Sequence, residues 1–301
     1  MEETKKYKLS NKEMTVLIAG IGAELKSLQT KNKIEYIWNA NPKYWNFSAP
    51  FLFPIVGTLR DKRTIIDGKE YAIKQHGLLR HQEFSVVEHT NEYLLLKNEF
   101  NAETLSMYPF QYQALVEYRI VGKTLVTTLK IINIDKRPIA FNLGGHPGFS
   151  CPLYQGEEFS DYTLYFSEPE TFSSPKVTKE ATLDFSVSVM SFQNLQVLPL
   201  DKKVFAVDTI IIPRVKSNSV SLFNKAKKGL KFTFENFKTL AIWTPNNDAP
   251  FICLEPWIGY NDHHDSDHDF YKKDDLITLA VGQEITVCYQ IEIIDETAKN
   301  L

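Results

Sequence analysis

The sequence predicts a mainly antiparallel β protein, and two observations lead to this prediction. Apolar residues alternate with polar residues along much of the chain, and a period of two is the pattern of strands whose two faces differ in exposure. Clusters of Gly, Pro and Asn separate the alternating segments, while segments with the apolar spacing of a helix are scarce. No linker, low-complexity tract or fixed-period repeat divides the 301 residues. We therefore expect one all-β domain over residues 1–301, a large antiparallel β-sandwich.

Three segments show the alternation most clearly. Residues 125–132 carry apolar or β-branched side chains in both alternating sets, so we expect a strand that is buried on both faces. In residues 230–235 and 285–293, large apolar side chains alternate with polar or smaller ones. We expect each of these two strands to have one buried face and one face in contact with water.

The composition excludes several classes of protein. Hydrophobic residues make up 43% of the chain and charged residues 24%, which is the composition of a folded protein. The 34 Lys and Arg against 37 Asp and Glu give a net charge of -3, whereas nucleic-acid binding usually shows as clustered excess of basic residues. We expect a small or neutral partner and no nucleic acid.

Cysteine usage and hydropathy favour a cytoplasmic protein. The three cysteines lie far apart and form no CxxC motif, so we expect neither a disulfide framework nor a thiolate zinc site. The apolar run 14–23 follows a segment that mixes Lys with Glu, and Glu24 and Lys26 come directly after it, unlike a signal peptide. The longest stretch without a charged residue, 138–156, is broken by prolines and glycines. A membrane-spanning helix is therefore not expected.

Several motifs for other chemistries are incomplete or missing. Residues 20–25 begin like a dinucleotide-binding loop, but Leu25 stands where the third glycine is needed. The sequence contains no Walker loop, G-x-S-x-G elbow or H-E-x-x-H motif. Residues 261–269 are rich in His and Asp, yet Phe270 and Leu276 occupy positions where an EF-hand loop has Gly and Glu. We interpret this tract as a solvated surface loop, with a metal site as the less favoured alternative.

Two segments have the features of a functional site. In residues 142–149, three glycines and a proline surround His146, and glycine permits turns and a close approach to a ligand. In residues 251–257, an apolar strand ends on Glu255 before a proline. Burying an unpaired carboxylate is costly, so Glu255 needs a partner or a function unless it faces water. Trp243, just upstream, is either a core residue or an aromatic face for a sugar.

These segments, taken in order, resemble the aldose 1-epimerase, or galactose mutarotase-like, superfamily and within it the LacX-like branch. The resemblance covers nearly the full length of the chain. It rests on the order and spacing of six pieces, namely residues 22–28, 36–38, 50–57 with Arg60, 76–80, 144–149 and 254–257. It implies a large antiparallel β-supersandwich whose concave face binds a sugar, in agreement with the period of two.

The resemblance also implies roles for individual residues. His146 corresponds to the general acid of the family and Glu255 to its general base. Arg60, His76 and Asp208 resemble the residues that hold sugar hydroxyls, although the surroundings of Asp208 match only loosely. The expected activity is therefore the interconversion of the α and β anomers of an aldose.

Anomer exchange explains why an acid and a base are both needed. Opening the pyranose ring removes a proton from the anomeric hydroxyl and adds one to the ring oxygen. Glu255 as a carboxylate can accept the first proton, and His146 as an imidazolium can donate the second. Rotation about the C1–C2 bond then exposes the other face of the aldehyde. This chemistry requires no metal, nucleotide cofactor or covalent intermediate, and it predicts a bell-shaped dependence of activity on pH.

The substrate and the reaction class each have alternatives at this stage. Arg60, Lys62, Arg63 and Arg80 are candidates for binding the phosphate of a hexose 6-phosphate, against a neutral hexose. A noncatalytic carbohydrate-binding module would share the fold. A glycoside hydrolase or lyase would use Glu255 with Asp208 as a carboxylate pair.

Overall fold

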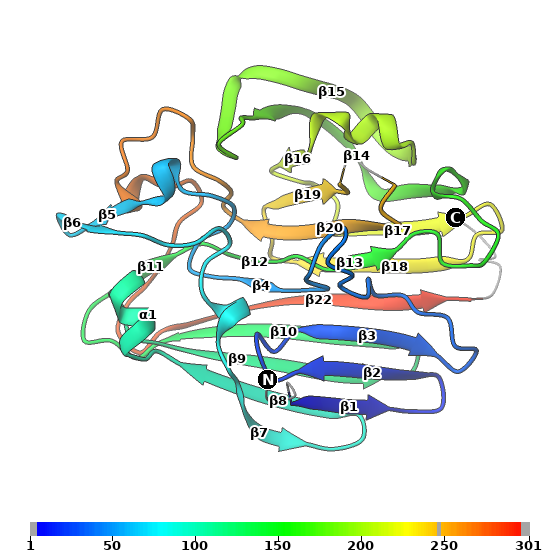
Figure 1. Cartoon of the computed structure of the whole chain (residues 1–301), viewed down its shortest axis with the longest axis horizontal. Helices are drawn as coiled ribbons and strands as arrows, with labels where there is room; N and C mark the ends of the chain where they lie inside the picture. The colour runs from blue at the N-terminus through cyan, green and yellow to red at the C-terminus, as the bar shows by residue number, and fades with distance from the viewer. Residues whose placement is uncertain (1–4, 246–247, 296–301) are drawn as a thin grey trace.

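A computed structural model describes residues 5–245 and 248–295 of the chain, and most of these residues lie in antiparallel sheets (Figure 1). The largest sheet among them has nine strands in the order β15-β14-β17-β18-β22-β10-β9-β8-β7. Its strands are β7 (Ser85–His89), β8 (Tyr93–Glu99), β9 (Tyr112–Val121), β10 (Thr124–Asn133), β14 (Tyr162–Val177), β15 (Leu183–Pro199), β17 (Ser219–Asn224), β18 (Gly229–Glu235) and β22 (Glu284–Ile294).

Two smaller sheets lie against the nine-stranded one. The first has the order β16-β19-β20-β12-β4, with β13 also paired to β20, and the second has the order β1-β2-β3. Their strands are β1 (Lys6–Ser10), β2 (Met14–Ala19), β3 (Leu25–Thr30), β4 (Phe51–Leu52), β12 (Leu143–Gly145), β13 (Gly148–Ser150), β16 (Ile210–Pro213), β19 (Thr239–Trp243) and β20 (Phe251–Ile258). Figure 1 shows β1, β2 and β3 over β8, β9 and β10.

Short elements connect the sheets. Two pairs of strands stand apart, β5 with β6 and β11 with β21. The bounds of these and of the helices are β5 (Thr64–Ile66), β6 (Lys69–Tyr71), β11 (Ile139–Phe141), β21 (Ile277–Leu279), α1 (Ala102–Met107), and the 3₁₀ turns η1 (Arg60–Lys62), η2 (Leu79–His81), η3 (Phe159–Asp161), η4 (Lys202–Val207) and η5 (Phe270–Lys272). None of the helices in the described part of the chain is long and apolar enough to cross a membrane.

Apolar side chains from the facing sheets form a common core. The ring of Phe149 on β13 lies 5.5 Å from that of Phe232 on β18. Tyr118 on β9 donates a hydrogen bond from its buried hydroxyl to the carbonyl of Ala23, beyond the end of β2, over 2.8 Å. One hydrophobic cluster includes residues of both layers. The prediction of an antiparallel β-sandwich is therefore confirmed.

The three strands expected from their alternation are present, with one difference in burial. In β18 and β22 the large apolar side chains are mostly buried and the residues between them are mostly exposed or half-buried, as predicted. In β10 one face is buried, but the other is only half-buried rather than enclosed. The half-buried face includes Lys130, which forms an ion pair with Glu284 over 2.8 Å. An ion pair of this kind is favoured where water reaches the sheet, and β-branched residues are also tolerated on such a face.

Candidate active site

His146 and Glu255 are brought together by the pairing register of β20. On one side of His146, Gly144 of β12 pairs with Trp257, and on the other side Gly148 of β13 pairs with Cys253. The register is the same on both sides of the gap between β12 and β13, so His146 lies directly opposite Glu255. Side chains in directly opposed positions of antiparallel strands have their Cβ atoms about 5 Å apart. Strand pairing thus joins two residues that are far apart in the sequence.

Backbone contacts hold the interrupted strand in this position. The backbone N–H of His146 donates to the carbonyl of Pro50 over 3.0 Å, and that of Leu254 donates to the carbonyl of Pro147 over 3.2 Å. A Cβ atom added to Gly144 would lie 2.7 Å from Cδ1 of Trp257. Glycine at this position therefore permits the close approach of β12 to β20, whereas the sequence analysis expected close approach to a ligand.

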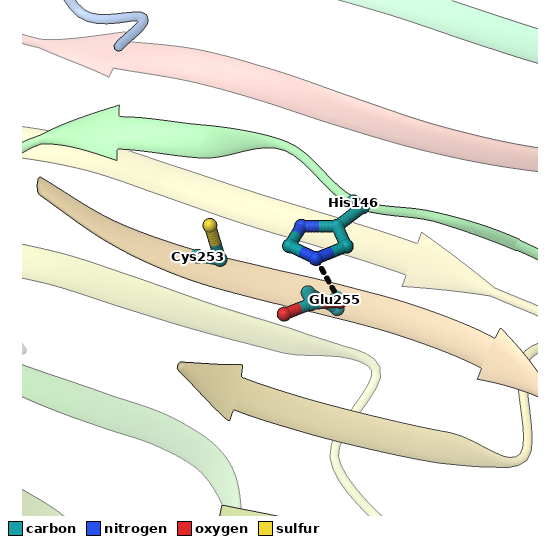
Figure 2. Close-up of side chains that lie close together, drawn as sticks. All are labelled: His146, Cys253 and Glu255. Atoms are coloured by element: carbon teal, nitrogen blue, oxygen red, sulfur yellow. Dashed lines mark ion pairs between the residues drawn. The ribbon is translucent and has the colours of Figure 1, made fainter. Parts of the chain in front are cut away.

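The two functional side chains contact each other inside the protein. Nε2 of His146 lies 3.0 Å from Oε2 of Glu255, and Figure 2 shows the imidazole edge directed at the carboxylate. His146 is 6% exposed and Glu255 is 1% exposed. Both nevertheless line a cavity of about 280 Å³. The pair is therefore enclosed on most sides but open to a ligand of small-molecule size.

Burial shifts the protonation of both groups toward their neutral forms. Loss of solvation lowers the pKa of His146 well below its usual value, and the positive charge of the nearby Arg80 lowers it further. Loss of solvation also raises the pKa of Glu255 well above its usual value, with a further rise caused by Asp208. Both directions favour an imidazole beside a carboxylic acid. Burial thus opposes the imidazolium and carboxylate expected from the sequence.

Four of the other predicted residues line the same cavity, and one does not. His76, Arg80, Asp208 and Trp243 lie in its wall together with His146 and Glu255. Arg60 is not among the lining residues. Its guanidinium instead donates to the carbonyl oxygen of Ser266 over 2.6 Å. The structure therefore places Arg60 in the support of a neighbouring loop and does not bring it into the cavity.

His76 is held as a neutral imidazole with a defined tautomer. Its Nδ1 accepts a hydrogen bond from the backbone N–H of Gly57 over 3.1 Å, so its proton resides on Nε2. Burial, with a smaller contribution from Arg80, lowers the pKa of His76 to about 3. The ring centroids of His76 and His146 are 5.2 Å apart, with the rings nearly perpendicular. His76 therefore offers the cavity one hydrogen-bond donor and no positive charge.

Aromatic rings enclose His146, and one of them was not anticipated. Trp243 lies edge-on to the imidazole with ring centroids 5.8 Å apart. Trp45 stacks on the imidazole with a centroid distance of 4.6 Å and an interplanar angle of 26°. Sequence reasoning did not find Trp45, although the aromatic run 44–47 outside the strand pattern is a signal. It also missed Gln75, Trp257 and Asn261, which are among the other lining residues.

Asp208 and Glu255 lie in the same part of the cavity. Asp208 follows η4 with a backbone φ of 76° and ψ of -109°, a combination outside the main regions that residues other than glycine adopt. Its side chain is exposed and accepts a hydrogen bond from the hydroxyl of Thr209 over 3.0 Å. Because Asp208 contributes to the raised pKa of Glu255, the two carboxyl groups interact electrostatically. The cavity wall therefore carries a second carboxyl group besides that of Glu255.

The His- and Asp-rich tract 261–269 does not gather its side chains around one point. Its charged groups instead pair with neighbours, as in His263 with Asp274 over 2.8 Å and His268 with Asp61 over 3.3 Å. Within the described residues, no three groups of this tract place potential ligand atoms close together. The interpretation as a surface loop is consistent with this arrangement.

One trio of potential metal-ligating residues lies at the candidate active site itself. The ligand atoms of His146, Cys253 and Glu255 lie within 4.8 Å of one another (Figure 2). Burial raises the pKa of the Cys253 thiol well above its usual value, and Glu255 raises it further. Metal coordination requires the thiolate, which this environment disfavours. The trio therefore fits proton exchange between His146 and Glu255 better than it fits metal binding.

Comparison with known proteins agrees with this geometry. The family model for aldose 1-epimerase matches residues 5–292. Protein LacX, in its plasmid-encoded form from Lactococcus lactis subsp. lactis, is 38% identical over 259 residues, which are 83% of this chain and 87% of that protein. The chromosomal LacX of the same organism matches equally.

Solved structures of related proteins share the fold over their whole length. A galactose mutarotase related enzyme from Lactobacillus acidophilus superposes with a TM-score of 0.89 at 29% identity, covering 98% of this chain and 100% of that one. A galactose mutarotase-like protein from Lactobacillus casei gives the same TM-score at 27% identity, covering 96% of this chain and 100% of that one. The architecture that presents His146 and Glu255 is therefore the galactose mutarotase-like fold.

Proposed function

From the premise that this chain belongs to the aldose 1-epimerase family, we propose that it interconverts the α and β anomers of a hexose or a hexose 6-phosphate. The observation that carries the proposal is the contact of 3.0 Å between Nε2 of His146 and Oε2 of Glu255 at the wall of a cavity. Two groups that exchange protons, placed side by side, can act on the two oxygens of one hemiacetal. Glu255 is the proposed base and His146 the proposed acid.

In the proposed reaction, the sugar lies with its anomeric hydroxyl at Glu255 and its ring oxygen at His146. Glu255 removes the proton from O1 while His146 delivers a proton to O5, and the C1–O5 bond breaks to give the open aldehyde. Rotation about C1–C2 presents the other face of the carbonyl. Reversal of both proton transfers then closes the ring. A positioned acid and a positioned base each contribute about 10² to 10⁴ in rate.

The raised pKa of Glu255 and the lowered pKa of His146 suit this exchange. The free pair holds one proton mainly as a neutral acid and a neutral imidazole. Transfer of that proton from Glu255 to His146 gives the reactive ion pair without any proton from solvent. Because the ion pair is the less stable form, both groups are strong in their roles: the carboxylate is a better base than usual, and the imidazolium is a better acid.

Surrounding side chains support binding and orientation in this proposal. His76 offers its Nε2–H to a sugar oxygen, and Asp208 accepts hydrogen bonds from sugar hydroxyls on the side of Glu255. The ring of Trp243 supplies an apolar face of the kind that stacks on a pyranose. Trp45 covers one face of His146 and so limits the rotation of the acid away from O5.

Anomer exchange measured directly is the test of this function. Pure α anomers of galactose, glucose and their 6-phosphates are dissolved with and without protein, and the approach to equilibrium is followed by polarimetry or by NMR exchange. We expect protein to accelerate at least one of these exchanges in proportion to its concentration. Exchange at the protein-free rate for every sugar would refute the proposal.

Two further measurements separate the other reaction classes. Binding of a hexose without acceleration of exchange would indicate a noncatalytic module on the same fold. Release of reducing ends from oligosaccharides would indicate a hydrolase that pairs Glu255 with Asp208. A complex with a hexose should place a carboxylate oxygen of Glu255 next to O1 and a ring nitrogen of His146 next to O5.

A further inference from the structure

A buried carboxylate behind the candidate active site is not explained by the proposed reaction. Glu24 directly precedes β3, is 7% exposed and does not line the cavity around His146 and Glu255. Its backbone carbonyl accepts a hydrogen bond from the N–H of Ala19 over 2.8 Å, which holds the residue at the end of β2. A buried carboxylate is costly unless hydrogen bonds satisfy it, so the partners of Glu24 indicate its role.

The partners of Glu24 include two backbone N–H groups of one loop. Its Oε1 accepts hydrogen bonds from the N–H of Ser48 and from that of Ala49, the latter over 3.0 Å. Its Oε2 lies 3.2 Å from Nζ of Lys26, whose side chain is 24% exposed. Glu24 thus has a cation beside one oxygen and uses the other to hold residues 44–50, which we call the 44–50 loop.

The 44–50 loop contacts His146 in two ways. Trp45 stacks on the imidazole with a centroid distance of 4.6 Å. At the other end of the loop, the carbonyl of Pro50 accepts a hydrogen bond from the backbone N–H of His146 over 3.0 Å. The two N–H groups bound by Glu24 lie between these contacts in the sequence. Glu24 therefore holds the segment that connects the ring covering the proposed acid to the carbonyl that holds its backbone.

The same loop also contacts a cation in the wall of the cavity. The guanidinium carbon of Arg80 lies 4.6 Å from the centroid of the Phe47 ring. Burial lowers the pKa of Arg80, and the charge of Glu24 counteracts this effect. Two roles of Glu24 therefore have to be separated, namely its reach to the loop and its charge near Arg80. The direct hydrogen bonds to the loop favour reach.

Building on the proposed function, we infer that Glu24 is a positioning residue for His146 and acts through the 44–50 loop. Its carboxylate fixes the backbone of the loop, and the loop fixes the imidazole through Trp45 and Pro50. Delivery of a proton to the ring oxygen requires the acid within hydrogen-bond reach, and a misplacement of about 1 Å can lower a rate by about 10². Because Glu24 does not line the cavity, it is not itself a catalytic residue.

Two conservative variants separate the reach of Glu24 from its charge. Glu24→Gln keeps the length of the side chain and an acceptor oxygen for both N–H groups of the loop, but it removes the charge. Glu24→Asp keeps the charge but is shorter by one methylene, so its carboxylate withdraws from the loop. Anomer exchange followed by NMR gives kcat and KM for both variants and for the wild-type chain.

Glu170 provides a matched control. It is 2% exposed, and its Oε1 also accepts hydrogen bonds from two successive backbone N–H groups, those of Lys216 over 3.1 Å and Ser217 over 2.7 Å. It does not line the cavity around His146. Glu170→Asp and Glu170→Gln therefore change the same kind of contact outside the candidate site. Thermal melting of all four variants verifies that they are folded and compares their losses of stability.

We expect Glu24→Asp to lower kcat by about tenfold and to change KM by less than about threefold, because the acid moves while the side chains that bind the sugar stay. Glu24→Gln should keep kcat within about threefold of the wild-type value. Both Glu170 variants should keep kcat within about twofold, even where they melt as early as the Glu24 variants. In the double variant with Trp45→Leu, the loss caused by Glu24→Asp should be smaller than in the wild-type background, because both changes act through one loop.

The NMR signals of the His146 imidazole give a readout besides activity. The ring current of Trp45 shifts the imidazole protons beneath it upfield. In Glu24→Asp this upfield shift should decrease, because the loop no longer holds the indole in place. In Glu170→Asp it should stay at the wild-type value.

Failure of this inference can be told apart from failure of the proposed function. If Glu24→Asp leaves kcat or the upfield shift unchanged, or if Glu24→Gln loses more kcat than Glu24→Asp, the reach of Glu24 does not position His146. An equal loss of kcat in Glu170→Asp would also refute the inference, because the effect would then follow stability alone. If the wild-type chain accelerates no aldose, the epimerase proposal is refuted, and the upfield shift alone decides whether Glu24 positions His146.

Discussion

The proposed catalytic pair, His146 and Glu255, and the loop 261–269 both combine histidine with acidic residues, but in opposite settings. The loop is the richest source of His and Asp in the sequence, and its histidines are paired with nearby acids at or near the surface. His146 and Glu255 are single residues in apolar segments, joined only by the pairing of β12 and β13 with β20. The loop contains more titratable side chains, but those of His146 and Glu255 are buried.

Burial changes the acid and base strength of an acidic residue and a histidine that lie side by side. Exposed pairs such as His263 with Asp274 are screened by water and contribute little. In the buried pair, the pKa of His146 is lowered and that of Glu255 is raised, so both neutral forms are favoured. The charged forms are then a stronger acid and a stronger base than the exposed groups are. The number of His and Asp residues in a segment is thus a poorer guide to function than the environment of two individual residues.

Removal of either member of the buried pair should have the largest effect. We expect Glu255→Gln and His146→Gln each to lower kcat for anomer exchange by about 10² to 10⁴, because each removes one proton-transfer group. The same changes at exposed residues, His263→Gln in the loop and Glu235→Gln at the end of β18, should leave kcat within a factor of about two. Exchange rates from NMR provide the measurement. Equal rates for all four variants would remove the distinction between the two regions.

The loop has one buried ion pair, and breaking it should affect stability. Nζ of Lys273 lies 2.5 Å from Oδ1 of Asp262, and both side chains are at most 5% exposed. Lys273→Met leaves the carboxylate buried without its cation, so we expect a loss of about 3–5 kcal/mol in the free energy of unfolding. Urea denaturation measures this loss.

Lys272→Met provides a matched control for that change. Lys272 is adjacent in sequence and its side chain is 65% exposed in its pairing with Asp267. We expect this substitution to change the free energy of unfolding by less than about 1 kcal/mol. If both variants lose the same stability, burial is not what distinguishes the two lysines.

The pH dependence of activity should reflect the buried setting of the pair. A bell shape requires the pair to hold one proton. A second proton is added only when the pH falls to the lowered pKa of His146, and the last is lost only when the pH rises to the raised pKa of Glu255. We therefore expect the acid limb of kcat/KM to lie below pH 6.5, the ordinary value for His.

This profile is measured by NMR exchange between about pH 4 and 10, with the protein-free rate subtracted at each pH. The alkaline limb should lie well above the ordinary range of a carboxyl group. Loss of activity with an acid midpoint at or above 6.5 would show that His146 titrates as an exposed imidazole does.

The fold was largely predictable because the alternation of apolar and polar residues within a segment indicates which face of a strand is buried. Alternation in residues 230–235 and 285–293 reported the burial of β18 and β22 correctly. The half-buried face of β10 was not predictable, because β-branched residues suit a wet face as well as a covered one. Local pattern therefore identified the strands but not what covers each face.

The candidate site was predictable only in part, because a cavity is made by segments that the sequence does not connect. His146 and Glu255 stood out from their Gly- and Pro-rich or apolar surroundings, and the resemblance to a family added His76 and Asp208. The same resemblance also pointed to Arg60, but its side chain turns to the carbonyl of Ser266, a partner more than 200 residues away. The aromatic run 44–47 marks Trp45 as unusual but does not say what it contacts, since stacking on His146 depends on tertiary packing.

Trp45 allows the smallest effect to be tested, namely the contribution of the ring that covers His146. Its indole stacks on the imidazole at 4.6 Å, and aromatic contacts of this kind contribute about 0.5–1.5 kcal/mol beyond buried area. We expect Trp45→Leu to lower kcat by about 2- to 12-fold, because an imidazolium forming under an aromatic face is stabilised by it. Trp45→Phe should recover most of the loss.

Phe185→Leu is the control for this change. It alters an exposed ring that is stacked on His263, and it should leave kcat unchanged. Trp38→Leu is unsuitable as a control because Trp38 is buried against Phe251. If Trp45→Leu and Phe185→Leu have the same kcat, a stacked histidine gains nothing from burial in this protein, and the contrast between the two regions reduces to the acid and base alone.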